Sequence, residues 1–264
     1  AGHCMNTSIK PDPWQHLAAL TAARIALGRS GSSLPTRALL DFDIAHALAR
    51  DAVHQPLDVG DLMARCREQL ALDVIVVHSQ AGDRLRYLQR PDLGRRLNEA
   101  GVAALGKQPG PCDLAIVIAD GLSATAVQAH TLPLVQALLP LLDGLQVAPL
   151  VIAEQGRVAL GDEIGALMGA RLVLILLGER PGLSSPDSLG AYLTFAPQVG
   201  RLDAERNCVS NIRDGGLPPA LAARKLAWLV RAALACRLTG VGLKDESEAL
   251  PSAEVVSRLA GANA

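Results

Sequence analysis

The segment from Arg171 to Tyr192, RLVLILLGERPGLSSPDSLGAY, constrains the fold more than any other part of the chain. Its run of branched aliphatic residues stops at Gly178, where a glutamate, an arginine, a proline and more glycines follow. Parallel strands are covered on both faces and read as nearly continuous apolar runs, and their ligands lie outside the carboxyl ends of the strands. The segment therefore predicts a buried strand that delivers a polar loop, Gly178 to Ser185, to the edge of a sheet.

The plain alternative for this loop is that Glu179 and Arg180 form a surface ion pair, which stabilises the fold little. The glycines and the proline around them favour a shaped site.

The chain beyond its first 70 residues alternates strand and helix patterns, which is typical of α/β folds with right-handed crossovers. We expect an α/β fold with a Rossmann-like, mainly parallel sheet flanked by helices and preceded by a mostly helical N-terminal region. The expected strands are Leu72–Val77, a short edge strand Leu85–Leu88, Leu114–Ala119, Ala148–Ala153, Leu172–Leu177, Tyr192–Ala196 and Cys208–Ile212. The expected helices are one opened by Pro91, then Ser123–Leu142, Gly161–Met168 and Pro218–Leu238.

Three regions follow from the pattern along the chain. They are a mostly helical region at residues 1–70, the Rossmann-like domain at residues 71–243, and a flexible tail at residues 244–264. Within the first region, alanine and leucine recur at helical spacing between Trp14 and Arg50, Thr36 can cap a helix, and a further helix is expected from about Asp58 to Glu68. Residues 1–4 precede Met5 and resemble a cloning remnant.

Composition excludes several classes of function. The 264 residues are 50% hydrophobic and carry a formal net charge of −1, which gives no electrostatic reason to expect nucleic acid or an anionic membrane as the main partner. Aromatic residues make up 2% of the chain, so few side chains can stack on bases. The five cysteines form no C-x-x-C pair, and neither they nor His46, His54 and His78 show the spacing of metal ligands. We see no membrane-length apolar run free of charges and no signal peptide, and expect a cytoplasmic location.

Two loops that follow expected strands could contact a ligand. Asp120-Gly121-Leu122-Ser123 could bind a phosphate if Ser123 caps the next helix, but the chain has no G-x-G-x-x-G or Walker sequence, which favours an ordinary strand end and helix start. Gln155-Gly156-Arg157-Val158 combines a tight turn with an apolar residue, and by itself it is an ordinary strand-to-helix turn.

Two further segments carry polar residues. Cys208 lies among small polar residues in the segment from Asn207 to Gly216 and could touch a ligand, although a cysteine in a strand is more often a small buried apolar residue. As a nucleophile it has no histidine nearby in the sequence. The segment from Arg90 to Arg96 could hold an anionic or carboxamide group or dock a partner, and a solvated helix surface is the competing interpretation.

Glycine-containing loops with few charges suit a large, uncharged, amide-rich ligand better than a triphosphate, and a carboxylate accepts hydrogen bonds from amides. The blocks RPDLGRRL, DGLSATAV, GRV, LLGERPGLSSPDSL and NCVSNIRDGGLPP occur in this order between roughly Thr21 and Leu238. In order and separation they resemble the small (light) subunit of adenosylcobalamin-dependent ethanolamine ammonia-lyase. The resemblance implies that Val158, Glu179 and Cys208 contact cobalamin, and that this chain holds no catalytic and no metal-ligating residue.

The resemblance also implies a partner and a chemistry. A large subunit with a TIM-barrel fold would bind ethanolamine and the adenosyl group, and homolysis of the Co–C bond would start the radical reaction that yields acetaldehyde and ammonia. The small subunit would close over the cobalamin at the interface, in an assembly of six large and six small subunits. The D-x-H-x-x-G motif of base-off cobalamin domains is absent around His78 and Gly82, so the corrinoid is expected to keep its own benzimidazole.

Two other functions stay open on the sequence. The chain could be a stand-alone Rossmann-like methyltransferase or oxidoreductase that uses the Asp120 loop, or a structural partner subunit that touches no cofactor. The sequence also leaves open whether the host encloses the protein in a bacterial microcompartment, which further amino alcohols are accepted, and what the residues before Thr21 do.

Overall fold

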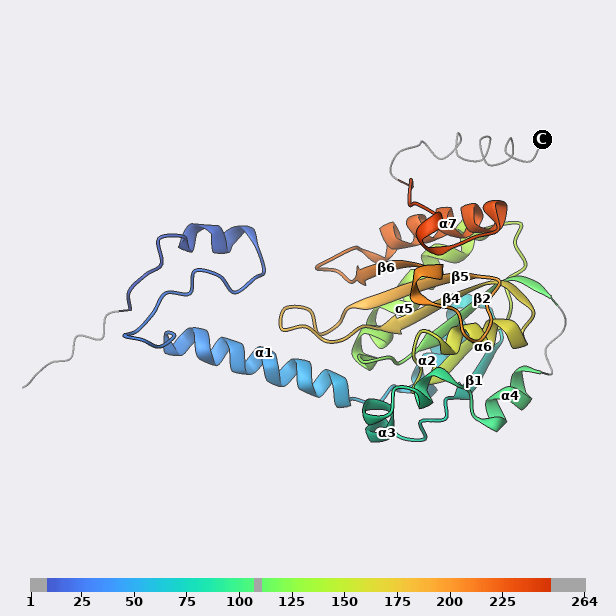
Figure 1. The fold of residues 1–264 in the computed structure, drawn as a ribbon, viewed down its shortest axis with the longest axis horizontal. Helices are drawn as coiled ribbons and strands as arrows, with labels where there is room; N and C mark the ends of the chain where they lie inside the picture. The colour runs from blue at the N-terminus through green and yellow to red at the C-terminus, as the bar shows by residue number, and fades with distance from the viewer. Residues whose placement is uncertain (1–8, 107–110, 248–264) are drawn as a thin grey trace, which may run out of the picture.

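The computed structural model describes residues 9–106 and 111–247, and places a six-stranded sheet between two layers of helices with an arm extending from one end (Figure 1). The suggested cloning remnant and most of the suggested tail lie outside the described residues. The strands are β1 (Val74–His78), β2 (Cys112–Ala119), β3 (Leu150–Glu154), β4 (Ala170–Gly178), β5 (Leu189–Phe195) and β6 (Arg206–Ile212). Their spatial order is β1-β3-β2-β4-β5-β6.

The sheet is mixed, so the expectation of a mainly parallel sheet was wrong. The pairs β1·β3, β3·β2 and β2·β4 are parallel, whereas β4·β5 and β5·β6 are antiparallel. A parallel connection needs a crossover, usually a helix. The segment between Gly178 and Leu189 contains no helix, and the only helical element between Phe195 and Arg206 is the short 3₁₀ turn Asp203–Glu205, so the chain reverses at both points.

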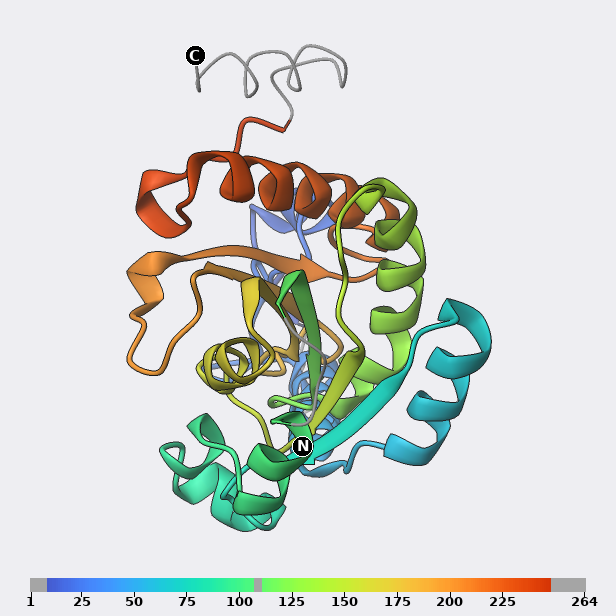
Figure 2. The same cartoon turned by 90° about the vertical axis from the view of Figure 1, so that its right-hand side faces the viewer.

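Alternate residues of the central strands divide the core between two helical layers. Leu172, Leu174 and Leu176 pack on one face, beneath α2 (Val59–Leu70), α5 (Ala124–Leu138) and α7 (Pro219–Cys236). Val173, Ile175 and Leu177 pack on the other face, beneath α4 (Glu99–Leu105) and α6 (Leu160–Leu167). The period of two is that of a strand covered on both sides, and Figure 2 shows the two layers on opposite sides of the sheet.

The structure corrects three local expectations. Leu85–Leu88 is no strand, because Asp83 accepts a hydrogen bond from the Arg86 amide and starts the helix α3 (Arg84–Gln89). Pro91 does not begin an α-helix. It is followed only by the short 3₁₀ turn Leu93–Arg95, and α4 begins after the capping residue Asn98. Thr36 is the first residue of α1 (Thr36–His54), and no side chain caps that helix.

One apolar stretch was overlooked in the sequence. Residues Ala124–Leu142, which form α5 and the 3₁₀ turn Leu139–Leu142, are long and apolar enough to cross a membrane. Half of this stretch is buried inside the structure, and α5 contributes Val127, Leu134 and Val135 to the core above β4. The stretch is therefore accounted for as a core helix.

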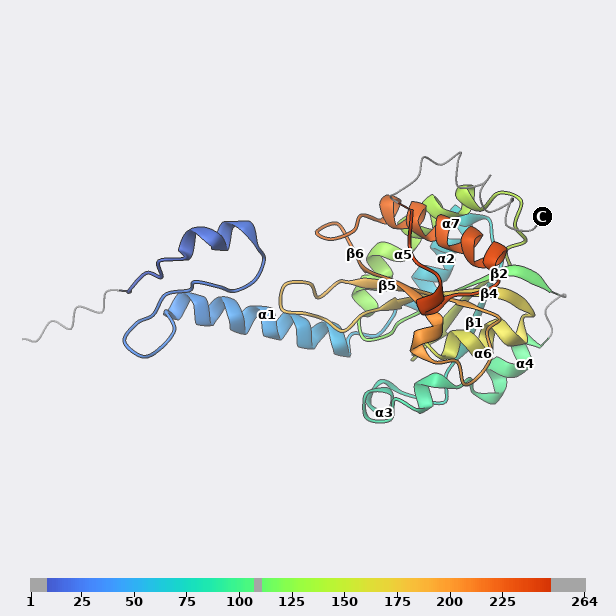
Figure 3. The same ribbon diagram turned by 45° about the horizontal axis from the view of Figure 1, so that its top comes forward.

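The N-terminal region extends away from the body. It comprises the 3₁₀ helix Gln15–Leu20, an extended segment and the 19-residue helix α1, whose C-terminal end alone approaches the sheet (Figures 1 and 3). Within α1, Ala52 alone is buried. Arg84 holds this end, since its Nε donates to the carbonyl of Val53 at 2.8 Å.

Candidate functional site

Four polar loops meet at one edge of the sheet, as the sequence predicts for the carboxyl ends of parallel strands. The strand register pairs Ala119 with both Ala153 and Leu177, so β2, β3 and β4 end together. Because β5 runs in the opposite direction, it starts at this edge, with Leu189 paired to Gly178 of β4 and to Ile212 of β6. We call this the carboxyl edge. It carries the loops that begin at Asp120, Gln155, Glu179 and Arg213, together with the last residues of β6.

Gly178 holds two of these loops against each other. A Cβ atom at Gly178 would lie 2.1 Å from the carbonyl oxygen of Ser123, closer than real Cβ contacts, so only glycine fits. The Leu122 amide donates to the Gly178 carbonyl at 2.8 Å, and the Ser123 hydroxyl donates to the Pro186 carbonyl at 2.8 Å. The Ser123 hydroxyl also accepts from the Ala126 amide and so caps α5. The two loops thus form one packed unit.

Glu179 is held by its neighbours in a defined position. The Ser188 hydroxyl donates to Glu179 Oε2 at 2.5 Å, and the Asn211 amide donates to the same oxygen at 3.2 Å. The Glu179 amide donates to the Ser188 carbonyl at 2.9 Å, and Gly190 leaves room for the carboxylate, since a Cβ there would lie 2.8 Å from Oε1. Oε1 accepts no hydrogen bond from the described residues. The half-exposed carboxylate therefore presents one free acceptor at the edge.

Cys208 belongs to the same group of residues. It pairs across the strands with Tyr192, and Gly190 contacts both Glu179 and the Tyr192 ring. Although Cys208 is exposed as a residue, desolvation raises the pKa of its thiol, and the charge of Glu179 acts in the same direction, while a hydrogen bond with Tyr192 opposes both. The thiol is therefore neutral near pH 7, which fits a contact residue better than a nucleophile.

Val158 lies on the same side of the sheet but is separate from these residues. It occupies the turn between β3 and α6 and packs, half-buried, on the apolar cluster that Tyr192 also covers. Its side chain has no polar atom, so it offers a ligand apolar contact only. The structure thus brings Glu179 and Cys208 together through Tyr192, and places Val158 on a shared apolar face.

Asp120 is a structural residue that the sequence did not distinguish from a phosphate-binding one. Its carboxylate is almost fully buried, accepts the Gly156 amide at 3.0 Å, and lies 3.4 Å from Nη1 of Arg84. Desolvation raises its pKa to about 6, against the opposing charge of Arg84. A buried carboxylate beside the start of α5 would repel a phosphate when ionised. The geometry therefore supports the reading in which this loop simply joins a strand to a helix.

Tyr87 and two arginines fix the neighbouring turn, and sequence reasoning missed them because it placed Tyr87 in an edge strand. The guanidinium groups of Arg84 and Arg157 both lie over the Tyr87 ring, at 4.9 and 4.2 Å from its centroid. Its hydroxyl donates to the Gly156 carbonyl at 2.9 Å. The sequence did contain a signal for this arrangement: Tyr87 lies four residues after the helix-capping Asp83, which is the spacing of one helical turn.

The segment from Arg90 to Arg96 is used within the chain. Arg90 pairs with Asp92 on the surface, and Arg96 binds Glu163 of α6 through two hydrogen bonds of 3.1 Å. The Glu163 carboxylate also accepts the Leu97 amide at 2.8 Å. Through Arg96 the segment therefore fastens the loop before α4 to α6, while Arg90 and Arg95 stay exposed on the surface. No cluster of His, Cys, Asp or Glu within the described ranges has the arrangement of a metal site.

Comparison with known proteins agrees with the resemblance. A sequence profile of the ethanolamine ammonia-lyase light chain family matches residues 11–244. A protein of Pseudomonas putida (strain W619) is 57% identical over 243 residues, covering 90% of this chain and 89% of its own length. A protein of Bradyrhizobium diazoefficiens is 59% identical over 239 residues (89% and 91%), and one of Azotobacter vinelandii is 56% identical over 257 residues (95% and 92%).

All three relatives carry the name ethanolamine ammonia-lyase small subunit. The family profile spans the N-terminal arm from residue 11, the whole sheet and the carboxyl edge with Val158, Glu179 and Cys208. The chain belongs to the ethanolamine ammonia-lyase light chain family.

Proposed function

We propose that this chain is the small, non-catalytic subunit of an ethanolamine ammonia-lyase, and that its carboxyl edge covers adenosylcobalamin at the interface with a large subunit. The observation that carries the proposal is the Glu179 carboxylate. Ser188 and Asn211 hold it through Oε2, and its Oε1 is left as a free acceptor beside an apolar, partly exposed surface.

The residues at this edge fit a corrinoid by the chemistry of their side chains. Cobalamin is large, uncharged over most of its surface and rimmed with carboxamides, whose N–H groups are donors that a carboxylate oxygen accepts. Glu179 supplies that acceptor. Cys208 supplies a neutral thiol, while Tyr192 and Val158 supply apolar cover. The sequence around His78 and Gly82 lacks the D-x-H-x-x-G motif of base-off cobalamin domains, which supports a base-on cofactor.

The task of this chain would then be to orient the cofactor and keep water away from it, since the protein around a cofactor supplies binding and orientation. Adenosylcobalamin, when bound, supplies the radical chemistry that converts ethanolamine to acetaldehyde and ammonia. We assign the substrate site to the large subunit, as the resemblance implies, and the Asp120 carboxylate at the carboxyl edge is buried and already bound by the Gly156 amide beside Arg84.

The partner and the assembly are part of the proposal. The name of the relatives implies a large subunit, and we infer a TIM-barrel partner in a complex of six large and six small subunits. A cytoplasmic location completes this proposal.

The alternative function, a stand-alone methyltransferase or oxidoreductase, loses its main support, because the Asp120 loop has a buried carboxylate where a nucleotide phosphate would bind.

Co-purification with the large subunit tests the proposal. The complex is expected to release ammonia from ethanolamine only when adenosylcobalamin is added, and to retain cobalamin, seen in its visible spectrum, more tightly than the large subunit alone. Equal retention with and without this chain would leave only a structural role. Turnover or nucleotide binding by this chain on its own would favour the stand-alone enzyme.

A further inference from the structure

Glu179 takes its position from two segments that come from different parts of the chain. Its Oε2 atom accepts from the Ser188 hydroxyl, at the end of the loop between β4 and β5, and from the Asn211 amide, near the end of β6. The direction in which the free oxygen Oε1 points therefore depends on how these two segments lie relative to each other. Arg213 contacts both segments.

Arg213 uses two atoms of one guanidinium group for these contacts. Its Nε donates to Oδ1 of Asn211 at 3.0 Å, and its Nη1 lies 3.6 Å from Oδ1 of Asp187, the residue before Ser188. The guanidinium is planar and rigid, so the two contacts fix the distance between the segments. Gly215 leaves room for this side chain, because a Cβ atom there would lie 3.1 Å from Nη1. Both charged side chains are partly buried, so solvent screens this pair less than a fully exposed one.

Asp187 is also held by the helix α5. Nε2 of His130, a buried residue of α5, lies within hydrogen-bond distance of Oδ2 of Asp187, at 3.3 Å. The carbonyl of the preceding residue, Pro186, accepts the Ser123 hydroxyl at 2.8 Å. Pro186, Asp187 and Ser188 are therefore fixed one after another, each by different partners.

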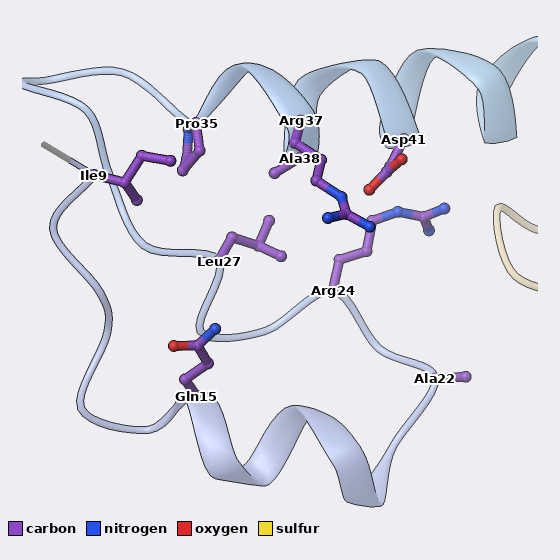
Figure 4. Close-up of a pocket in the computed structure, with 9 residues that line it drawn as sticks. All are labelled: Ile9, Gln15, Ala22, Arg24, Leu27, Pro35, Arg37, Ala38 and Asp41. Atoms are coloured by element: carbon purple, nitrogen blue, oxygen red, sulfur yellow. The ribbon is translucent and has the colours of Figure 1, made fainter. Parts of the chain in front are cut away.

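The outer half of the same loop, residues 180–185, has fewer such contacts. Gly182 and Ser185 form hydrogen bonds with each other across a turn. In the described part of the chain, one hydrogen bond from elsewhere reaches this half, from Nη2 of Arg24 to the Leu183 carbonyl at 3.3 Å. Arg24 belongs to the arm, where it lines a groove between α1 and the segment before it, near Asp41 (Figure 4). The inner contacts, close to Ser188, are thus the ones that place Glu179.

The backbone of Asn211 needs support of its own. Its φ of +56° lies in the left-handed region, which residues other than glycine adopt rarely. The Leu217 amide donates to the Asn211 carbonyl at 2.8 Å, and a Cβ atom at Gly216 would lie 2.4 Å from the same carbonyl oxygen. Arg213 holds the side chain of Asn211. Because such a conformation persists only where its surroundings fix it, these contacts keep the Asn211 amide directed at Glu179.

We propose that Arg213 is a positioning residue, which holds the two segments together and so aims the free Oε1 atom of Glu179 at a carboxamide of the corrinoid. The proposal rests on the function proposed above, and adds to it a residue that acts without touching the cofactor. Because Arg213 acts through Glu179, its loss cannot weaken cobalamin binding more than the loss of Glu179 does. Its effect should also disappear when Glu179 is absent.

A double-mutant cycle in the complex with the large subunit tests this proposal. Arg213→Gln is expected to raise the dissociation constant for adenosylcobalamin, measured by its visible spectrum, about threefold, and Glu179→Ala to raise it more. In the Glu179→Ala background, Arg213→Gln should change nothing. Arg65→Gln is the matched control, because it breaks an exposed arginine–aspartate pair on α2 and should leave the dissociation constant unchanged. An equal effect of Arg213→Gln in both backgrounds, or no effect in either, overturns the proposal.

Hydrogen–deuterium exchange of the full chain gives a readout that needs neither cobalamin nor the large subunit. Arg213→Gln is expected to speed exchange of the Asn211 amide about threefold or more, because the hydrogen bond of this amide to Glu179 is loosened. The Leu174 amide in the centre of β4 should exchange as in the wild type, which shows that the fold as a whole is intact. Wild-type exchange at Asn211 overturns the proposal.

Asp187→Asn changes the other side of the same pair and keeps the shape of the side chain. It should raise the dissociation constant for cobalamin as Arg213→Gln does, and should lose this effect in the Glu179→Ala background. Unchanged affinity in Asp187→Asn contradicts the link between the two segments and overturns the proposal. Unchanged affinity in Glu179→Ala counts instead against the proposed function, so the two failures are distinguishable.

Discussion

Replacement of Gly178 by alanine tests whether the carboxyl edge depends on the close approach of two backbones. The added Cβ would lie 2.1 Å from the Ser123 carbonyl oxygen and 2.5 Å from that of Asp120. Real Cβ contacts are not closer than 3.0 Å, so β4 and the loop before α5 must move apart by roughly 1 Å. Both neighbours are backbone atoms, which cannot turn away as a side chain can.

The expected cost follows from two losses. Overpacking of a well-packed interior costs about 1–3 kcal/mol. The separation also stretches the hydrogen bond from the Leu122 amide to the Gly178 carbonyl, and a buried backbone group left without its partner costs about 1–3 kcal/mol. We therefore expect Gly178→Ala to lower the free energy of unfolding by about 2–6 kcal/mol, and to displace Glu179, the next residue.

Urea unfolding of the full chain, followed by far-ultraviolet circular dichroism, measures this cost. Gly60→Ala is the matched control, because Gly60 lies in α2 and its Cβ would meet only the Asp58 carboxylate at 3.5 Å. In a helix this change is expected to stabilise by up to about 1 kcal/mol. If Gly178→Ala unfolds at the wild-type urea concentration, the close approach has no energetic importance and the reasoning is refuted.

Three further changes have defined outcomes in the same unfolding assay. Arg206→Met removes the partner of the buried Asp162 carboxylate, which Arg206 binds at 2.6 and 2.8 Å, and should cost about 3–5 kcal/mol; a loss under about 1 kcal/mol would contradict a buried ion pair. Burial raises the pKa of Asp120 to about 6, above roughly 3.9 in an unfolded chain, so the folded state binds this proton more tightly and stability falls as pH rises from about 4 to about 6. Asp120→Asn should flatten that part of the stability curve, and an unchanged slope would contradict the burial. Tyr87→Phe leaves the Gly156 carbonyl without its donor and should cost about 1–2 kcal/mol; wild-type stability would show that water replaces the hydroxyl.

Secondary structure was predicted best where a buried apolar run ends abruptly in a polar loop. The run Leu172–Leu177 is apolar at every position because both faces of β4 are covered, so strand and edge were both readable. The position of Glu179 at the carboxyl edge follows from this prediction, because Glu179 comes directly after the strand. The prediction of a strand at Leu85–Leu88 was wrong, since a four-residue run in which only Arg86 is charged fits a strand as well as one side of a helix, and the deciding feature was the Asp83 cap. The direction of β5 was also missed, because strand patterns carry no sign of orientation.

The partners of the site residues were beyond sequence reasoning. Ser188 and Asn211 hold Glu179 from nine and 32 residues away, and the distance along the chain says nothing about their contact. Asp120 was recognised as an edge residue, but its burial depends on Gly156 and Arg84, which come from other elements. Loops that read as separate turns in the sequence become one site only when the sheet brings their strand ends together.

The affinity of the complex for cobalamin tests the central claim most directly. Glu179→Gln keeps the shape of the side chain and removes its charge, while Glu68→Gln, on the exposed surface of α2, removes a charge elsewhere. A charge-assisted hydrogen bond is roughly twice as strong as a neutral one, so loss of the charge should cost about 1 kcal/mol. In the complex with the large subunit, we therefore expect Glu179→Gln to raise the dissociation constant for cobalamin, measured by its visible spectrum, about fivefold or more. Glu68→Gln should leave it unchanged. Equal affinity of Glu179→Gln and wild type, with the complex intact, would contradict the assignment of Glu179 to the cofactor.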